Sequence, residues 1–410
     1  MKCILIGAGA RGMIYGRWAV AHGIQITGVA ERRPDRLRDA GTALNVPEDR
    51  LFSDASQLLA QGRLADAAII ATMDRDHYGH TMQALALGYD ILLEKPISPD
   101  PRECLAIEAE ATRLNRKVTV CHVMRYTNLF SALKKIVDSG EVGRIISIQH
   151  TENIGNFHMA HSFVRGNWRN SKESSCLILQ KSCHDLDMLL WLVGRHCTRV
   201  ASFGSLTYFR PENAPEGAAD RCLGCPCAGD CRFDARKAYL PALGCWPTDM
   251  VSLEQTEEAV LEALRTGPYG RCVFHCDNDV CDHMSTILEF EGGATATFSL
   301  SGQTNRCHRD IHIMCEHGEI LADDDTNLIE IRSFASNNVE PCTSRLIHPG
   351  AILSGHGGGD GGLMEDFAAG KADRTSIAQS IESHLMAMAA EESRLTGRVI
   401  RMDEFRASLQ

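Results

Sequence analysis

Short apolar runs alternate with helical patterns over the first third of the chain. The runs cover residues 2–6, 26–31, 65–72, 89–96 and 118–123. Between them lie helical stretches such as 80–88, which ends at a glycine, and 101–115, which has a proline in its first turn. Buried strands that alternate with helices are typical of a parallel, doubly wound α/β sheet. We therefore predict such a domain over residues 1–124.

Beyond residue 124 the apolar pattern becomes more strand-like and is interrupted by turns. Segments such as EFEGGATATF (289–298) predict antiparallel hairpins. Together they predict an α+β domain over residues 125–410 with a large open, mainly antiparallel sheet. Within this domain we expect a Cys-, Pro- and Gly-rich insertion at about 210–283, a flexible loop at 355–362, a helix at 375–397 and a last strand within 398–405.

Length, charge and apolar content favour a two-domain protein that binds neither nucleic acid nor a membrane. The length of 410 residues favours two domains, and the net charge of −11 gives no support to binding of nucleic acid or an anionic membrane. No apolar run is long enough to cross a bilayer, and the start MKCILIGAGARG does not resemble a signal peptide. We therefore expect a cytoplasmic protein, whose seventeen cysteines are reduced thiols or metal ligands.

The first predicted strand leads into a glycine-rich turn. Gly7, Gly9 and Gly12 form the pattern G-x-G-x-x-G at the start of a helix. The first glycine allows a tight turn, the second lets the backbone approach a pyrophosphate, and the third packs helix on strand. The loop, with Ala8 and Arg11, is therefore predicted to bind a dinucleotide. The alternative is a glycine-rich turn without a ligand.

The end of the second predicted strand favours NAD. Glu31 stands there, where a carboxylate can accept hydrogen bonds from the adenosine ribose and would repel a 2′-phosphate. Arg32 and Arg33 follow directly. They could hold that phosphate, which leaves NADP open, or could simply lie on a solvated turn.

Three stretches carry a family resemblance. GAGARG (7–12), the segment 71–96 that ends in LLEKP, and QKSCHDLD (180–187) resemble the glucose–fructose oxidoreductase / inositol dehydrogenase / MocA (Gfo/Idh/MocA) family. The resemblance covers essentially the whole chain. It implies a Rossmann domain followed by an open-sheet domain, NAD(P)-dependent oxidation or reduction of sugars, polyols or related compounds, and a homo-oligomer that pairs through the open sheet.

The resemblance also implies roles for individual residues. Lys95 would lie beside the nicotinamide and the substrate, and His184 would transfer the proton. Further positions would lie at the cofactor or beside the substrate: Thr72, His77, Glu94 and Arg125.

Lys95 and His184 also suit hydride transfer on chemical grounds alone, without the family resemblance. Hydride transfer from a secondary alcohol needs a base for the hydroxyl proton and a positive charge for the developing alkoxide, which histidine and lysine supply. In a helix that begins near Cys183, His184 and Asp187 share one face, so Asp187 could bind a substrate hydroxyl or orient the imidazole. The alternative is a plain helix start. We expect that role for Ser182, as N-cap, and for Asp185, in the first turn.

Two neighbouring positions depart from the family pattern. Four residues before His184 the family often has an aspartate, where this chain has Gln180, followed by Lys181. Glutamine cannot act as a base, but it can hydrogen-bond substrate or cofactor, and Lys181 could add a second positive charge. This departure weakens the assignment of an inositol-dehydrogenase-like mechanism and of a named substrate.

Two loops are further candidates for the substrate site. The predicted loop 157–171 places donors and an aromatic ring together in His161, Trp168 and Arg169, which suits a hydroxylated or anionic sugar; the alternative is an exposed loop with a buried tryptophan. The glycine-rich loop could bring His356 and Asp360 to the site, or could be a plain flexible loop.

A cysteine cluster lies in the insertion. Cys222, Cys225, Cys227 and Cys231 have the spacing C-x2-C-x-C-x3-C, in which a thiolate pair two residues apart is typical of zinc knuckles. A structural zinc would hold an insertion with little apolar core of its own. One ligand could come from elsewhere, such as Cys245, Cys272, Cys276 or His275. The alternatives are an iron–sulfur cluster and unligated thiols.

Three functions are compatible with these features. The leading prediction is an NAD(P)-dependent dehydrogenase of a sugar, polyol or sugar derivative. A second is an NAD-dependent glycosidase that oxidises a sugar transiently, eliminates its aglycone and reduces it again. A third is a nucleotide-sensing regulator without catalysis, which would need neither Lys95 nor His184.

Overall fold

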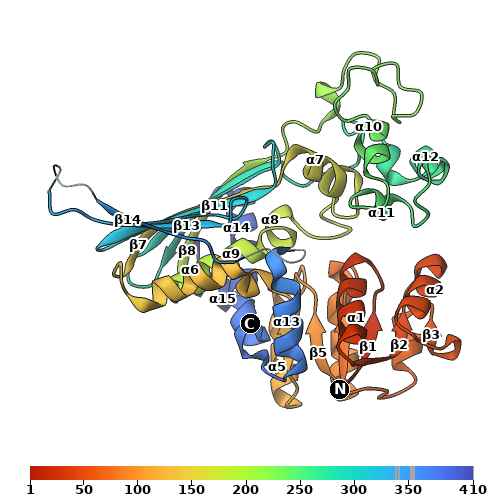
Figure 1. Cartoon of the computed structure of the whole chain (residues 1–410), viewed down its shortest axis with the longest axis horizontal. Helices are drawn as coiled ribbons and strands as arrows, with labels where there is room; N and C mark the ends of the chain where they lie inside the picture. Colours follow the sequence, from red (N-terminus) through yellow and green to blue (C-terminus); the bar gives the residue numbers. More distant parts are fainter. Residues whose placement is uncertain (338, 340–341, 351–355, 410) are drawn as a thin grey trace.

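The N-terminal domain of the computed structural model is a six-stranded parallel sheet (Figure 1). The structure describes residues 1–337, 339, 342–350 and 356–409. The strand order is β3-β2-β1-β4-β5-β6, with β1 at Lys2–Ile6, β2 at Gln25–Ala30, β3 at Leu51–Phe52, β4 at Ala67–Ile70, β5 at Asp90–Leu93 and β6 at Val118–Val120. The winding direction changes between β1 and β4, so the carboxyl ends of β1, β4 and β5 lie together, where ligands of such sheets bind.

Helices cover both faces of this sheet, as expected for a doubly wound fold. They are α1 (Ala10–Ala21), α2 (Pro34–Ala43), α3 (Ala55–Leu59), α4 (His77–Ala86) and α5 (Pro101–Arg113). The prediction of a parallel α/β domain is confirmed, and all five predicted strands are present. Strand β3 was missed because it has only two residues, both partly exposed, and so leaves no apolar run in the sequence.

The second domain contains a nine-stranded sheet of order β14-β13-β12-β11-β7-β10-β9-β8-β15. Its strands are β7 (Ile145–Asn153), β8 (Cys197–Ser205), β9 (His283–Phe290), β10 (Thr295–Ser301), β11 (His308–Cys315), β12 (Gly318–Asp323), β13 (Leu328–Ser333), β14 (Thr343–Ile347) and β15 (Ile400–Arg401). Strands β9 and β10 form the predicted hairpin, with Glu289 opposite Thr295. Strands β7 and β10 pair in parallel and the other neighbours are antiparallel, which confirms the predicted mainly antiparallel sheet.

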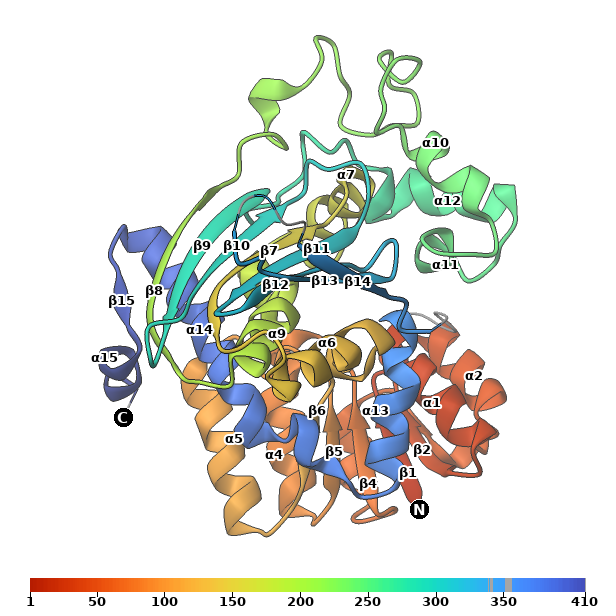
Figure 2. The same cartoon turned by 60° about the vertical axis from the view of Figure 1, so that its left-hand side comes forward.

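One face of this sheet is covered by helices (Figure 2). The covering helices are α6 (Asn128–Ser139), α8 (Leu177–Gln180), α9 (Cys183–Val193) and α14 (Ile377–Thr396). The opposite face is open, and strand β9 alternates buried and exposed side chains accordingly. Phe203 and Ile287 on neighbouring strands are 72% and 55% exposed on that face. No helix among the described residues is long and apolar enough to span a membrane.

Three local predictions differ from the structure. The predicted loop 157–171 contains α7 (Asn156–His158) and a π-helix at Met159–Arg165. The second half of the predicted glycine loop begins α13 (Gly359–Ala368). The last predicted strand is only Ile400–Arg401, after which α15 (Met402–Ala407) forms. These short elements are held by contacts distant in sequence, which local periodicity does not reveal.

The division of the chain at residue 124 is not a clean division in space. The C-terminal helices α13 and α14 return to the first domain, where α13 packs against α1 and α14 against α5 (Figure 1). The insertion forms a separate lobe with α10 (Ala235–Tyr239), α11 (Thr248–Val251) and α12 (Glu257–Thr266). Its small apolar core consists of Cys222, Ala235, Tyr239, Val260 and Leu264.

Candidate functional site

The glycine loop has the geometry of a dinucleotide-binding turn. Gly7 has φ +91°, and a Cβ there would lie 2.5 Å from the carbonyl oxygen of Ala71. A Cβ on Gly12 would lie 2.0 Å from the Gly7 carbonyl oxygen, so the helix packs closely on the turn. At Gly9 the nearest atom to a Cβ would be 3.8 Å away, on Arg36. Two glycines are therefore required by packing, whereas Gly9 leaves its backbone open to a phosphate.

Glu31 closes this loop from the end of β2. Its Oε2 accepts a hydrogen bond from the Ala8 N–H at 2.9 Å, and its Oε1 accepts one from the Arg33 N–H at 2.9 Å. The neighbouring cation is already engaged, because Arg32 lies 3.2 Å from a carboxylate oxygen of Asp76. A fixed carboxylate at this position fits a ribose and disfavours a 2′-phosphate.

Arg11 joins the glycine loop to β5 and to the second domain. Its Nε donates to Glu94 Oε1 at 2.7 Å, and its Nη2 donates to Asp360 Oδ1 at 2.6 Å. Tyr15 also donates to Glu94, at 2.6 Å. Burial opposes the charge of Glu94, but Arg11 and Lys95 outweigh it and hold the pKa of that carboxyl below its usual value. The structure thus brings Asp360 to the glycine loop; the side chain of His356 lies outside the described residues.

Thr72 and His77, which are also predicted to lie at the cofactor, are in the segment between β4 and β5. Thr72 Oγ1 is 3.3 Å from His80 Nδ1. The buried ring of His77 lies between two carbonyl oxygens, 2.7 Å from that of Pro96 and 3.2 Å from that of Thr72. His77 therefore ties the carboxyl ends of these two strands together, and its ring nitrogens face the protein.

Lys95 links the first domain to the second. It follows β5, and its ammonium donates to the backbone carbonyl oxygen of Gln180 at 2.6 Å. The amide of Gln180 donates to the carbonyl oxygen of Trp168 at 2.9 Å, so its side chain is directed into the protein. The backbone carbonyl at position 180 is thus the acceptor for Lys95, whereas the side chain that departs from the family pattern holds the preceding loop.

The helix α9, which begins within the QKSCHDLD motif, buries its charged face. In α9, His184 is 6% exposed and Asp187 is fully buried. Asp187 accepts two hydrogen bonds from Arg125, each at 2.7 Å. Burial, only partly offset by Arg125, raises the pKa of the Asp187 carboxyl. Arg125 crosses between the domains in a 3₁₀ turn at Val123–Tyr126, so this ion pair fixes α9 beside the end of β6.

The expected positions of Ser182 at the N-cap and Asp185 in the first turn of α9 are confirmed, but their contacts differ from those of a plain helix start. Ser182 occupies the N-cap position, but its hydroxyl makes no capping hydrogen bond. Asp185 is fully buried and accepts hydrogen bonds from Arg309 at 2.7 Å and from His150, with an N–O distance of 2.9 Å. It anchors α9 to the sheet. Arg309 lies 124 residues away, so no local pattern could reveal this role.

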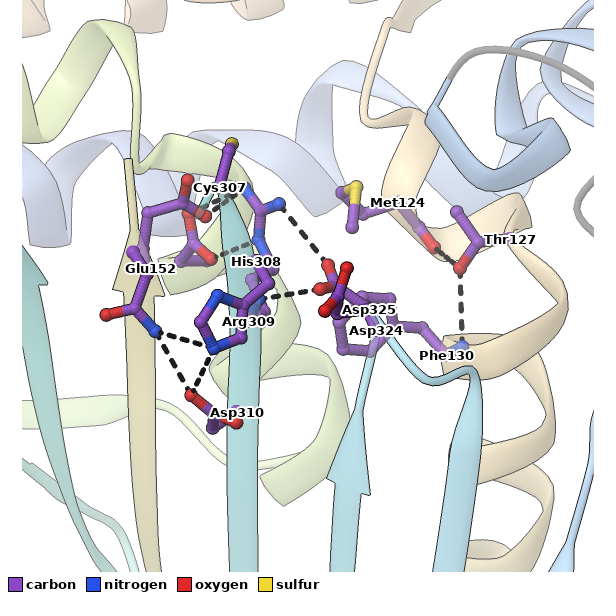
Figure 3. Close-up of polar contacts among 12 residues, drawn as sticks. Met124, Thr127, Phe130, Glu152, Cys307, His308, Arg309, Asp310, Asp324 and Asp325 are labelled. Atoms are coloured by element: carbon purple, nitrogen blue, oxygen red, sulfur yellow. Dashed lines mark hydrogen bonds and ion pairs between the residues drawn. The ribbon is translucent and has the colours of Figure 1, made fainter. Parts of the chain in front are cut away.

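Lys181 joins a charged network on the helix-covered face of the sheet, in which Figure 3 shows Glu152, Arg309 and Asp324. Its ammonium lies 2.9 Å from Glu152 Oε1. Arg309 pairs with Glu152 and lies 3.7 Å from Asp324. Burial opposes the charge of Lys181, but Glu152 outweighs it and raises the pKa of the ammonium. The predicted second positive charge is therefore present but paired.

Several residues at this junction gave no clear signal in the sequence. His122 and His384 lie edge-to-face to each other, and His122 also to His184. His158 lies 3.7 Å from the sulfur of Cys307. Burial, together with Lys181, lowers the pKa of His158 well below its usual value. Single histidines are common in sequences, so only the tertiary structure identifies His122, His158 and His384 as part of this junction.

The predicted substrate loop turns its polar groups toward the insertion. The ring of His161 stacks on Tyr269 at 4.7 Å, and its Nδ1 lies 3.0 Å from the hydroxyl of Tyr239. Arg169 donates to both carboxylate oxygens of Asp277, at 2.7 and 2.9 Å. Trp168 packs against the main core. His161 and Arg169 hold the insertion against the rest of the second domain. A role of His161, Trp168 and Arg169 as substrate ligands stays a prediction.

The cysteines of the insertion line one small cavity of about 20 Å³. Its thiols are Cys222, Cys225, Cys227, Cys231 and Cys272. The Ala219 N–H donates to the Cys225 sulfur at 3.4 Å. However, no three His, Cys, Asp or Glu side chains of the described residues form a group that could hold a metal ion as they stand. The predicted four-thiol metal site is therefore not assembled in this structure.

Comparison with known proteins agrees with this architecture. The model of the oxidoreductase family with an NAD-binding Rossmann fold matches residues 1–122, and that of the GFO/IDH/MocA C-terminal domain matches residues 130–226. YteT of Bacillus subtilis is 26% identical over 363 residues, 85% of this chain and 82% of that protein. Inositol 2-dehydrogenase of Corynebacterium glutamicum (strain R) is 29% identical over 207 residues, 48% of this chain and 55% of its own length.

Solved structures share the fold at low identity. An oxidoreductase from Agrobacterium radiobacter, solved with NAD+, L-tartaric acid and magnesium, has a TM-score of 0.69 at 16% identity and matches 98% of this chain and 99% of its own. The WlbA dehydrogenase from Bordetella pertussis, solved with NADH and UDP-GlcNAcA, has a TM-score of 0.66 at 17% identity, with 98% of both chains covered. With both domains matched in order along the chain, this protein belongs to the Gfo/Idh/MocA family of NAD-binding oxidoreductases.

Proposed function

We propose that this protein is an NAD-dependent dehydrogenase that oxidises a secondary hydroxyl of a polyol, a sugar or a sugar derivative. The observation that carries the proposal is the meeting of Lys95, at the end of β5, with the backbone of Gln180, four residues before His184. A cation and an imidazole thus lie where the switch point of the sheet and the second domain meet. The inositol dehydrogenase and WlbA matches support a carbohydrate or polyol as substrate class.

NAD, when bound at the glycine loop, would supply the hydride acceptor. The residues of the chain would do the rest. His184 would take the hydroxyl proton, and the Lys95 ammonium would stabilise the developing alkoxide. The buried Arg125–Asp187 pair would hold α9, and with it His184, in a fixed orientation. Glu31 would bind the adenosine ribose, so NAD is the proposed cofactor rather than NADP.

A panel assay tests this proposal. Purified protein is incubated with NAD and free sugars, polyols and chromogenic glycosides, while NADH and released chromophore are recorded together. NADH that accumulates with a free sugar or polyol supports the dehydrogenase. Chromophore release that needs NAD but leaves no net NADH would replace it with the redox-neutral glycosidase. Tight NAD binding with no turnover on any compound would favour the regulator.

A structural zinc ion is our proposal for the cysteine cavity of the insertion. Support comes from its size, which suits a single atom, and from its five thiols. The thiols would have to rotate toward a common centre to bind it. Metal analysis of purified protein should give one zinc per chain, and Cys222→Ser should lose it; metal-free protein with an unchanged melting temperature after chelation would refute the site.

The cellular location and the oligomeric state are two further proposals. All seventeen cysteines are free thiols, which fits the proposed cytoplasmic location. The open sheet face exposes Phe203 and Ile287, which fits a homo-oligomer that pairs through this face. Light scattering should therefore show an oligomer that Phe203→Asp dissociates, and a monomeric wild type would contradict the proposed pairing.

A further inference from the structure

A row of aromatic rings runs from the second domain into the insertion. Trp246, which precedes α11, has its ring beside those of His158 and His161, with centroids 5.2 and 5.6 Å away. Phe157 of α7 lies on another side of Trp246, at 5.9 Å. His161 in turn stacks on Tyr269 of the insertion, with centroids 4.7 Å apart. The row, which we call the aromatic row, consists of Tyr269, His161, Trp246 and His158, with Phe157 beside Trp246.

One end of the aromatic row lies near the proposed catalytic lysine. Burial lowers the pKa of His158 well below its usual value, and the positive charges of Lys181 and Lys95 lower it further. In physiological salt a charge acts on another group mainly over distances of about 8–10 Å. The His158 ring, which contacts Trp246, is therefore also in the neighbourhood of the Lys95 ammonium.

The other end of the aromatic row lies toward the cofactor loop. Burial raises the pKa of the Tyr269 hydroxyl, and the positive charges of Arg36 and Arg33 oppose this rise. Arg36 is beside the glycine loop, since its Nη1 would lie 3.8 Å from a Cβ on Gly9. Figure 1 and Figure 2 both show the lobe with α11 and α12 on the side of the first domain that carries α1 and α2. The row thus spans the domain junction between the glycine loop and Lys95.

Two rings in the middle of this assembly are exposed, unlike rings that only pack a core. Trp246 is 49% exposed and Phe157 is 36% exposed, whereas Tyr239, which lies against the same His161 ring, is fully buried. The planes of Trp246 and Phe157 are perpendicular, at 89°, so the two rings form a corner. Exposed aromatic surface beside polar groups at a domain junction is typical of a ligand site.

We propose that Trp246 and Phe157 form a stacking site for the six-membered ring of a sugar or cyclitol substrate. This inference rests on the proposed function and narrows its substrate class, because an open-chain polyol has no flat face to stack. The C–H groups on one face of a sugar ring make that face apolar, and the negative face of an indole attracts them. The neutral imidazole of His158, beside Trp246, can both donate to and accept from a ring hydroxyl.

The first test observes Trp246 directly, by ¹⁹F NMR on protein labelled with 5-fluorotryptophan in the presence of NAD. The chain has four tryptophans, and the signal that disappears in Trp246→Phe is that of Trp246. Within a panel of methyl pyranosides and myo-inositol, at least one compound should shift this signal in a saturable way. Glucitol, the open-chain control, should leave it unchanged at the same concentration. No shift with any ring compound, or an equal shift with glucitol, would overturn the inference, and a shift caused by NAD alone would assign the rings to the cofactor instead.

The second test uses the ring substrate that is active in the panel assay. Trp246→Ala should raise KM about tenfold to a hundredfold with kcat nearly unchanged, because it removes binding that substrate and transition state share. Trp246→Phe keeps an aromatic face and should restore most of the affinity, and the Kd for NAD should stay unchanged in both variants. The matched control Phe334→Ala removes a ring that is 58% exposed after β13 and should leave KM at the wild-type value.

The outcomes separate this inference from the proposed function. An unchanged KM in Trp246→Ala would overturn the stacking site while leaving the dehydrogenase in place. Absence of turnover in the wild type would instead refute the proposed function, and the ¹⁹F titration would still decide whether Trp246 binds a sugar ring.

Discussion

The Lys95 ammonium lies 2.6 Å from the backbone carbonyl oxygen of Gln180. The two residues belong to different domains and are 85 positions apart in the sequence. A carboxylate in this position would neutralise the cation. A backbone carbonyl holds the cation in place but carries no net charge. Lys95 can therefore remain a full positive charge beside the position where an alkoxide would develop.

Replacement of Lys95 should abolish most of the turnover and leave the affinity for NAD nearly unchanged. Lys95→Met should lower kcat by about a hundredfold to a thousandfold, as expected when a donor to a developing oxyanion is removed. The Kd for NAD should stay within about twofold, because the glycine loop is intact. Lys135→Met, on the exposed side of α6, is the matched control and should leave both constants unchanged. An active Lys95→Met would remove this residue from the site.

The Arg125–Asp187 pair should be essential for stability. Asp187→Asn leaves the buried Arg125 guanidinium without a countercharge, which should lower the free energy of unfolding by about 3–5 kcal/mol. Asp403→Asn is the matched control, since Asp403 pairs with Arg401 at 3.0 Å on the surface and should cost less than about 1 kcal/mol. Urea unfolding compares the two variants. Equal losses of unfolding free energy in the two variants would show that the buried pair contributes no more to stability than the surface pair.

The attachment of the insertion should weaken in acid. Burial, with Arg165, lowers the pKa of His161 to about 4, whereas an unfolded histidine titrates at about 6.5. Between these values the unfolded state binds more protons, so stability falls as pH decreases from about 6.5 to 4. His161→Gln should reduce this slope in melting temperatures recorded across that range. A variant with the same slope as wild type would place the acid sensitivity elsewhere.

Glu31 should set the preference for NAD. Glu31→Ser removes the carboxylate that would repel a 2′-phosphate and leaves Arg32 and Arg33 nearby. The ratio of the Kd for NADP to that for NAD should fall by about tenfold or more, equal to about 1.4 kcal/mol. Quenching of the protein's tryptophan fluorescence during titration with NAD and with NADP measures the two Kd values. A wild type that already prefers NADP would contradict the assignment of Glu31.

Much of the fold was predictable because its strands and helices leave local patterns. Runs such as KCILI and VTVCHV are apolar because both faces of the first sheet are buried, and the glycine loop follows from its position after a strand. The π-helix at 159–165 leaves no such pattern. Neither do the partners of Asp185, since His150 and Arg309 come from distant strands.

The candidate site was only partly predictable for the same reason. Lys95 and His184 stood out through motif context, and their chemistry needs no knowledge of the fold. His122 did not, because its position beside His184 depends on how β6 and α9 pack. The direction in which a polar side chain points was least predictable, as Gln180 and Arg169 show by turning toward the protein.

The most direct test follows one labelled atom from substrate to cofactor. A polyol or sugar that is active in the panel assay is deuterated at its carbinol carbon, and NMR then records whether deuterium reaches C4 of the nicotinamide. The account predicts stoichiometric transfer by wild type and loss of transfer in both Lys95→Met and His184→Gln, with NAD binding retained. Deuterium that does not reach the nicotinamide although the substrate is consumed, or transfer that persists in both variants, would contradict it.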